Sequence, residues 1–154
     1  MKKLLMVLLV FTLTLSLSSC KKHDSEVFDE SLMHALGMFG SSKTNLEIDS
    51  ISYVYFGADY EQTRVVFYIF AIQYTQEGDR MDKFALLFTQ KYNNEMNYSI
   101  ENHDAYENMM TNFNEYVRVF KNNPLELPYE NTKLVTSKLT ARQVDSYVEK
   151  ALGK

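Results

Sequence analysis

The segment at residues 62–75 constrains the fold more than any other, because it is apolar on both of its faces. It is rich in β-branched and aromatic residues, which favour a strand, and its odd and even positions are both apolar from Val65 to Ile72. An antiparallel strand usually alternates between apolar residues that face the core and polar residues that face water. Both faces of this strand are therefore predicted to be covered, by the chain's own helices, by another subunit or partner chain, or by a ligand.

Tyrosines define the ligand alternative. The chain has 11 Tyr and 10 Phe among its 154 residues. Tyrosine buries its ring while keeping a hydroxyl at a wet edge, and it is common in binding surfaces. If a small molecule occupies a tyrosine-lined concavity on this sheet, the candidate residues are Tyr53, Tyr55, Tyr68 and Tyr74.

The surrounding pattern predicts an antiparallel meander of three or four strands. Alternating or apolar runs indicate strands at four places, and turn residues separate them. The predicted strands are 46–56, 62–75, 82–91 and 96–100. The predicted turns are Gly57-Ala58-Asp59, Gln76-Glu77-Gly78-Asp79 and Asn93-Asn94, the last of which suits a tight hairpin because Asn tolerates positive φ.

Three amphipathic helices are predicted around this meander. Apolar residues at a 3.6-residue period indicate helices at 25–39 and 104–120 and a last one that starts at Thr140. Gln143 is the expected capping-box partner of Thr140, and Gly153 suits the helix end. Residues 124–131 are predicted as a loop, and 132–136 as a short extended piece.

The predicted fold class is α+β: an N-terminal helix, a meander of three or four antiparallel strands, then two helices. No internal repeat or long linker divides it, so residues 25–154 are predicted to form a single domain. The element order resembles the cystatin-like and NTF2-like folds, in which a curved sheet wraps a helix. Such folds carry both binding proteins and enzymes, so the resemblance implies no particular function.

The first twenty residues are predicted to be a targeting segment. Two lysines follow Met1, and an uncharged apolar run then extends to Leu17 at most. That run is shorter than the roughly 20 residues that a transmembrane helix needs. A positive start, a short apolar stretch and small residues after it are typical of a secretory signal peptide, here residues 1–19.

The end of this segment, Leu17-Ser18-Ser19-Cys20, resembles the lipobox of bacterial lipoproteins. The resemblance covers residues 1–20 only. It implies that a diacylglyceryl group is added to the thiol of Cys20, that the chain is cut between Ser19 and Cys20, and that the new amine is acylated. Two or three acyl chains give stable membrane anchoring. Residues 20–24 would then be the lipidated cysteine and a short tether.

Few other residues indicate chemistry. The sequence has no glycine-rich phosphate loop, paired-cysteine zinc motif or nucleophile elbow. His103, Asp104 and Glu107 are the best metal candidate, but a solvated helix start explains them more simply. A net charge of −4 lacks the basic footprint of a nucleic-acid binder. No catalytic residue, metal or other cofactor is predicted.

These patterns together predict a lipoprotein of the bacterial cell envelope, anchored to a membrane through Cys20 and facing away from the cytoplasm. Its domain is predicted to be a non-catalytic binding or interaction module, with an envelope protein as a possible partner and no nucleic acid. One alternative is a small-ligand-binding or enzymatic domain with a tyrosine-lined pocket. Another is a structural subunit of an envelope complex.

Overall fold

The computed structural model describes residues 27–79, 81–122 and 127–153. The chain divides into two compact units, residues 1–30 and 31–154. Of the first unit only residues 27–30 are described, as the first turn of a helix that runs to residue 40. The predicted signal peptide, Cys20 and the tether lie outside the described residues. Among the described helices, none has the length and apolar character to cross a membrane.

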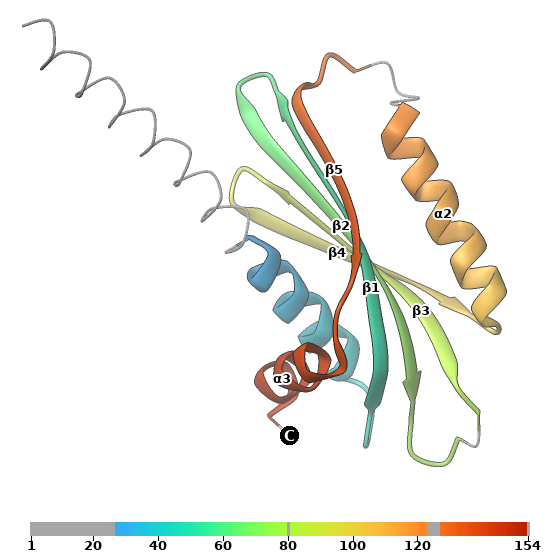
Figure 1. The fold of residues 1–154 in the computed structure, drawn as a ribbon. Helices are drawn as coiled ribbons and strands as arrows, with labels where there is room; N and C mark the ends of the chain where they lie inside the picture. Colours follow the sequence, from blue (N-terminus) through green and yellow to red (C-terminus); the bar gives the residue numbers. More distant parts are fainter. Residues whose placement is uncertain (1–26, 80, 123–126, 154) are drawn as a thin grey trace, which may run out of the picture. The chain divides into compact units, whose positions relative to one another are not determined.

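A five-stranded antiparallel sheet is the centre of the second unit (Figure 1). Its strand order is β4-β3-β2-β1-β5, and every neighbouring pair is antiparallel. The strands are β1 (Glu47–Tyr60), β2 (Thr63–Thr75), β3 (Lys83–Tyr92), β4 (Glu95–His103) and β5 (Glu130–Lys138). The helices are residues 27–40, α2 (Tyr106–Asn122) and α3 (Ala141–Leu152).

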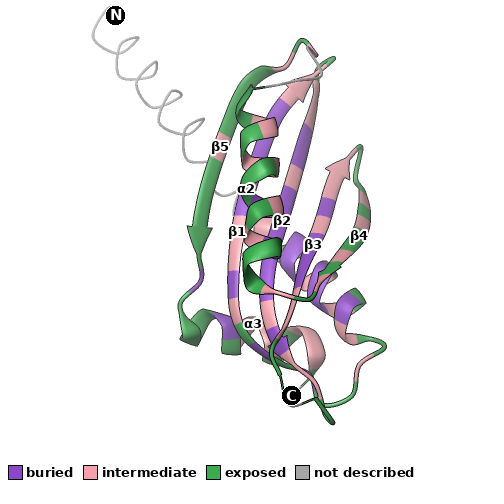
Figure 2. Ribbon diagram, turned by 90° about the vertical axis from the view of Figure 1, so that its right-hand side faces the viewer, coloured by how far each residue is buried: buried purple, intermediate pink, exposed green. Residues whose placement is uncertain are grey.

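Helix α2 covers one face of the sheet, called here the α2 face (Figures 1 and 2). Met109 and Phe113 are the buried residues of α2 and pack in one cluster with Val54, Ile69 and Leu86 of the three central strands. Near the end of α2, Phe120 stacks on Phe56 with ring centroids 5.0 Å apart. The apolar stripe of α2 therefore packs on the alternate residues of β1, β2 and β3.

Residues 31–40 and α3 lie on the opposite face, called here the α3 face (Figure 1). Leu32 and Leu36 have no exposed surface, and the ring of Phe39 meets that of Tyr74 edge-on at 4.9 Å. Gly40 lies against Leu152 of α3, so closely that a Cβ at Gly40 would come within 2.4 Å of a Leu152 methyl carbon. The chain's own helices thus contribute to the cover on the second face of β2.

The turn predicted at Gly57-Ala58-Asp59 is wrong. β1 continues to Tyr60, and the hairpin turns at Glu61 and Gln62, whose φ angles are 47° and 66°. Gly57 serves a different purpose inside the strand: a Cβ there would lie 2.1 Å from the Tyr55 hydroxyl oxygen. The glycine makes room for a neighbouring ring, which is another common use of glycine in strands.

The prediction of three or four strands followed by two helices also needs correction, because β5 lies between α2 and α3. β5 pairs with β1 from Ser52–Lys138 to Asp59–Glu130. It contains the whole of the predicted extended piece, 132–136, and the last two residues of the predicted loop, 124–131. Eight of its nine residues are exposed, and the other, Leu134, is half-buried. Without a buried face, β5 has no apolar alternation to mark it.

The structure confirms the predicted fold class and several predicted strands, turns and helix caps. The fold class is α+β, and β2, β3 and β4 lie where strands are predicted. Asn93 and Asn94 close the β3–β4 hairpin with φ of 48° and 64°. α3 starts with the expected capping box between Thr140 and Gln143. It ends at Gly153 in the left-handed conformation.

Candidate functional site

The four candidate tyrosines lie on the same face of the sheet, the α3 face, but not at one place. Tyr55 pairs directly with Tyr68 across β1 and β2, and their ring centroids are 5.1 Å apart. Tyr53 is 6.3 Å from the Tyr68 ring, so these three form one aromatic group. Tyr74 lies six residues further along β2, against Phe39. Neither of the two pockets described below is lined by all four.

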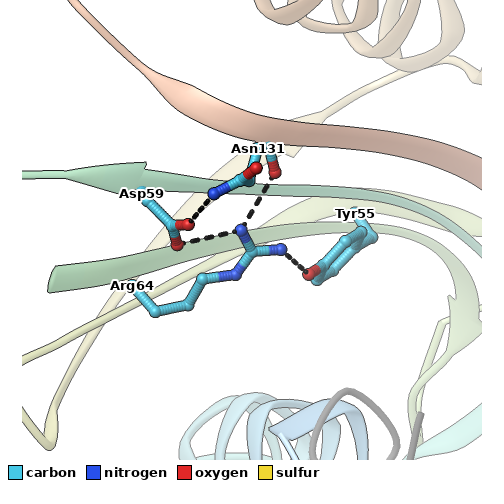
Figure 3. Close-up of polar contacts among 4 residues, drawn as sticks. All are labelled: Tyr55, Asp59, Arg64 and Asn131. Carbon is cyan, nitrogen blue, oxygen red and sulfur yellow. Dashed lines mark hydrogen bonds and ion pairs between the residues drawn. The ribbon is translucent and has the colours of Figure 1, made fainter. Parts of the chain in front are cut away.

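Tyr55 belongs to a polar cluster that joins three strands, called here the Arg64 cluster (Figure 3). The Arg64 guanidinium donates to the Tyr55 hydroxyl at 3.2 Å, to Asp59 Oδ1 at 3.2 Å and to the Asn131 carbonyl at 3.1 Å. The Asn131 amide donates to Asp59 Oδ2 at 2.7 Å. Asn131 is itself left-handed, with φ of 47°. The cluster fixes β5 to the β1–β2 hairpin and uses most of the donor groups of Arg64.

Electrostatics agree with this structural role. The hydrogen bond from Asn131 and the contact with Arg64 lower the pKa of Asp59, so this carboxylate stays ionised in ordinary solution. The Arg64 guanidinium and the Asp59 carboxylate are thus paired with each other at 3.2 Å. The Arg64 cluster explains why Tyr55 is held in place rather than directed at a ligand.

A second polar cluster, called here the Glu101 cluster, lies between β4 and α2. The Glu101 carboxylate accepts from Asn112 Nδ2 at 2.5 Å and from the Tyr116 hydroxyl at 3.0 Å. His103 Nε2 is 3.0 Å from Glu101 Oε1, and no hydrogen bond to this nitrogen is found among the described residues. Burial, and then the hydrogen bond to Glu101, raise the pKa of Tyr116. Its phenol therefore remains a neutral donor to the carboxylate.

The sequence places Glu101 and His103 on one face only if the predicted strand continues through to His103. Residues two apart on a strand share a face, so Glu101 and His103 point together, toward α2. The sequence-based metal candidate groups His103 with Asp104 and Glu107 instead, because it places His103 at the start of a helix. In the structure His103 is the last residue of β4, and α2 begins at Tyr106. Within the described ranges, no three His, Cys, Asp or Glu residues are grouped closely enough to hold a metal.

A pocket of about 530 Å³ opens at the end of the sheet next to His103. Its walls come from the end of β2, the β2–β3 connection and the end of β4. Asp79, Asp82 and Asp104 contribute carboxylates, and Lys83 is paired with Asp79 at 2.7 Å. The apolar part of the wall consists of Tyr74, Met81 and Phe84. Of the four candidate tyrosines, Tyr74 is therefore the one at this mixed polar and apolar pocket.

A smaller pocket of about 310 Å³ lies on the α2 face, near the end of α2. Phe67, Phe88 and Phe120 give it an apolar wall, while Gln90, Asn97 and Ser99 give it a polar side. Tyr68 and Thr89 also border this pocket, although their own side chains point to the other face of the sheet. The Thr89 hydroxyl is buried and makes no hydrogen bond among the described residues.

In comparisons with known proteins, no family model, no curated protein and no solved structure matches this chain. The resemblance of the element order to cystatin-like and NTF2-like folds therefore stays a prediction.

Proposed function

We propose that this protein is a lipoprotein of the bacterial cell envelope, anchored through Cys20, whose domain is a non-catalytic binding module. The anchor rests on the lipobox at Leu17-Ser18-Ser19-Cys20. Cys20 is the chain's single cysteine, so it has no partner for an internal disulfide and is available for acylation.

The pocket of about 530 Å³ at the end of the sheet is the observation that carries the binding role. Helices pack on both faces of the sheet, which directs binding toward its ends, edges and loops. Ligand sites are typically concave, with apolar walls and a few placed polar groups. The pocket beside His103 has this character, since Tyr74, Met81 and Phe84 share it with three carboxylates.

For the alternative of a small-ligand or enzymatic domain, the same pocket suggests which of the four candidate tyrosines would contact a ligand. Tyr74 is the candidate tyrosine that lines this pocket. Tyr55 does not line it, and its hydroxyl accepts a hydrogen bond from Arg64. A small ligand in this pocket would contact Tyr74 and the carboxylates around it. Tyr68 borders the smaller pocket, and Tyr53 and Tyr55 line neither of the two.

Mass spectrometry of the mature chain tests the anchor. We expect wild-type protein to start at an acylated Cys20, and Cys20→Ser protein to be neither acylated nor cut before residue 20. The matched control is Lys22→Ser, which leaves the lipobox intact and should be processed normally. An unmodified mature chain that starts at another residue would contradict the lipoprotein proposal.

Site-specific photo-crosslinking in cells tests the pocket. Met81 lines the pocket and is 76% exposed, while Met38, on the helix of residues 27–40, does not line it and is 50% exposed. A photoreactive residue at position 81 should give a discrete adduct with the bound molecule or partner, and the same residue at position 38 should not. Equal adducts from both positions, or none from position 81, would place binding elsewhere.

A further inference from the structure

The two edges of the sheet differ in how they resist pairing with another strand. β5 carries Lys133 and Lys138, and its register with β1 is irregular between Gly57 and Asp59. The irregularity coincides with Asn131, whose φ is 47°. Lysines and bulges at an edge are the usual devices that prevent strand addition. β5 is thus a protected edge.

β4 carries no lysine and no bulge, and its inward-pointing charge, Glu101, is bonded to Tyr116 of α2. Its nine residues, EMNYSIENH, include no lysine, arginine or proline, and its register with β3 runs from Phe84–His103 to Tyr92–Glu95 without a shift. No strand in the described part of the chain pairs with its outer side. The side chain of Ile100, on the α3 face of this strand, is 40% exposed. Figure 2 shows β4 as a sheet edge beside β3. An edge strand with a regular register and no lysine, proline or bulge is a template for pairing.

We propose that β4 pairs with β4 of a second copy of this chain, antiparallel, with the two-fold axis at Ser99. This register pairs all nine residues of the strand. The two five-stranded sheets then become one ten-stranded sheet with the order β5-β1-β2-β3-β4-β4-β3-β2-β1-β5. The interface is isologous, as closed homodimers require. It goes beyond the proposed binding role and does not depend on the lipid anchor.

The side chains of β4 are complementary to themselves in this register. On the α3 face, Tyr98 of one copy lies opposite Ile100 of the other, an aromatic and β-branched pair of the kind that stabilises sheets. On the α2 face, Glu101 lies opposite Asn97, an amide that can donate to a carboxylate. Glu95 lies opposite His103, so the acidic end of each strand meets the imidazole end of the other.

The neighbouring register shows why the axis belongs at Ser99. Moving the axis by one residue to Tyr98 would place Glu95 directly opposite Glu101 twice. Like charges directly opposed across strands are destabilising. An axis at Ile100 avoids this clash but leaves Glu95 beyond the end of the paired strand. Charge repulsion therefore disfavours the axis at Tyr98, and the larger number of paired residues favours Ser99 over Ile100.

Disulfide trapping tests the position of the axis. In an antiparallel pair, directly opposite Cα atoms are about 4.5–5.5 Å apart, within the range a disulfide spans. Under mild oxidation, full-length Ser99→Cys protein in detergent should form a covalent dimer that wild-type protein does not form. Ser137→Cys is the matched control, because Ser137 is an exposed serine on the protected edge β5. Equal cross-linking by the two variants would overturn the proposal.

Charge substitution at the same residue tests the dimer itself without oxidation. Ser99→Lys would place two ammonium groups opposite each other at the axis. We expect it to raise the dimer dissociation constant at least about tenfold, equivalent to about 1.4 kcal/mol, while Ser137→Lys leaves it unchanged. Mixing Ser99→Lys with Ser99→Glu chains should restore dimers as mixed pairs in native mass spectrometry. A wild-type chain that is monomeric at micromolar concentration, or a Ser99→Lys dimer as tight as wild type, would refute the interface.

Discussion

Replacing Gly57 by alanine is the sharpest test of how β1 is packed. A Cβ at this position would lie 2.1 Å from the Tyr55 hydroxyl oxygen, 2.6 Å from its ring and 2.7 Å from a nitrogen of Arg64. Real Cβ atoms do not approach other atoms so closely, so the ring has to move. Tyr55 is only 4% exposed and is packed against Tyr68, which leaves the ring little room.

The magnitude follows from the two interactions that would be disturbed. Overpacking a close-packed site costs about 1–3 kcal/mol. Displacing Tyr55 also breaks its hydrogen bond with Arg64, which contributes about 1 kcal/mol more. We therefore expect Gly57→Ala to lower the free energy of unfolding by about 2–4 kcal/mol.

Urea unfolding followed by circular dichroism measures this loss. Gly37→Ala is the matched control, because a Cβ at Gly37 meets nothing within 4 Å and the residue is helical. That variant should be stabilised by up to about 1 kcal/mol. In the Tyr55→Phe background the cost of Gly57→Ala should shrink, since the nearest atom is gone. If Gly57→Ala unfolds at the wild-type urea concentration, the argument for a close approach at Gly57 is wrong.

Three further predictions concern packing, capping and titration. Phe113→Ala should lower the free energy of unfolding by about 3–5 kcal/mol in the same urea assay, whereas Tyr106→Ala, at a ring that is 51% exposed, should change it by less than about 1 kcal/mol. Thr140→Ala removes the α3 cap and should lower the free energy of unfolding by about 1 kcal/mol. Thr111→Ala within α2 is its control and shows whether loss of a threonine that is not a cap has the same effect. Burial raises the pKa of Tyr98 to about 12. Its contribution to stability is therefore complete below about pH 10, where free tyrosine titrates, and is lost as the pH rises toward 12. Tyr98→Phe should reduce this alkaline loss, and an unchanged pH profile would contradict the raised pKa.

The elements that sequence reasoning predicts correctly are those determined by neighbouring residues. The Asn93-Asn94 turn depends on the tolerance of Asn for positive φ. The Thr140–Gln143 capping box is also complete within one helical turn. The apolar stripe of α2 identifies Met109 and Phe113, because a 3.6-residue period is a local property.

The features that were missed depend on distant residues. β5 is a strand because β1 offers it an edge some 80 residues earlier in the sequence, from Ser52 to Asp59. The sequence suggests a turn at Gly57, whereas in the structure the glycine is needed because the Tyr55 side chain occupies the space beside it. The Glu101 cluster forms only when α2 brings Asn112 and Tyr116 over β4. The end-of-sheet pocket likewise joins three segments that no local pattern connects.

The position of β5 affects how this protein behaves when it is partly unfolded. β5 and α3 make their main contacts with β1, so they can detach together while the β1–β4 meander remains folded. Such a detachment would uncover the backbone edge of β1, a strand whose residues Val54, Tyr55 and Phe56 are buried. A long apolar edge of that kind recruits other chains. The exposed and lysine-bearing β5 therefore acts as a gatekeeper against aggregation, and a chain truncated before Glu130 is expected to precipitate rather than persist as a four-stranded monomer.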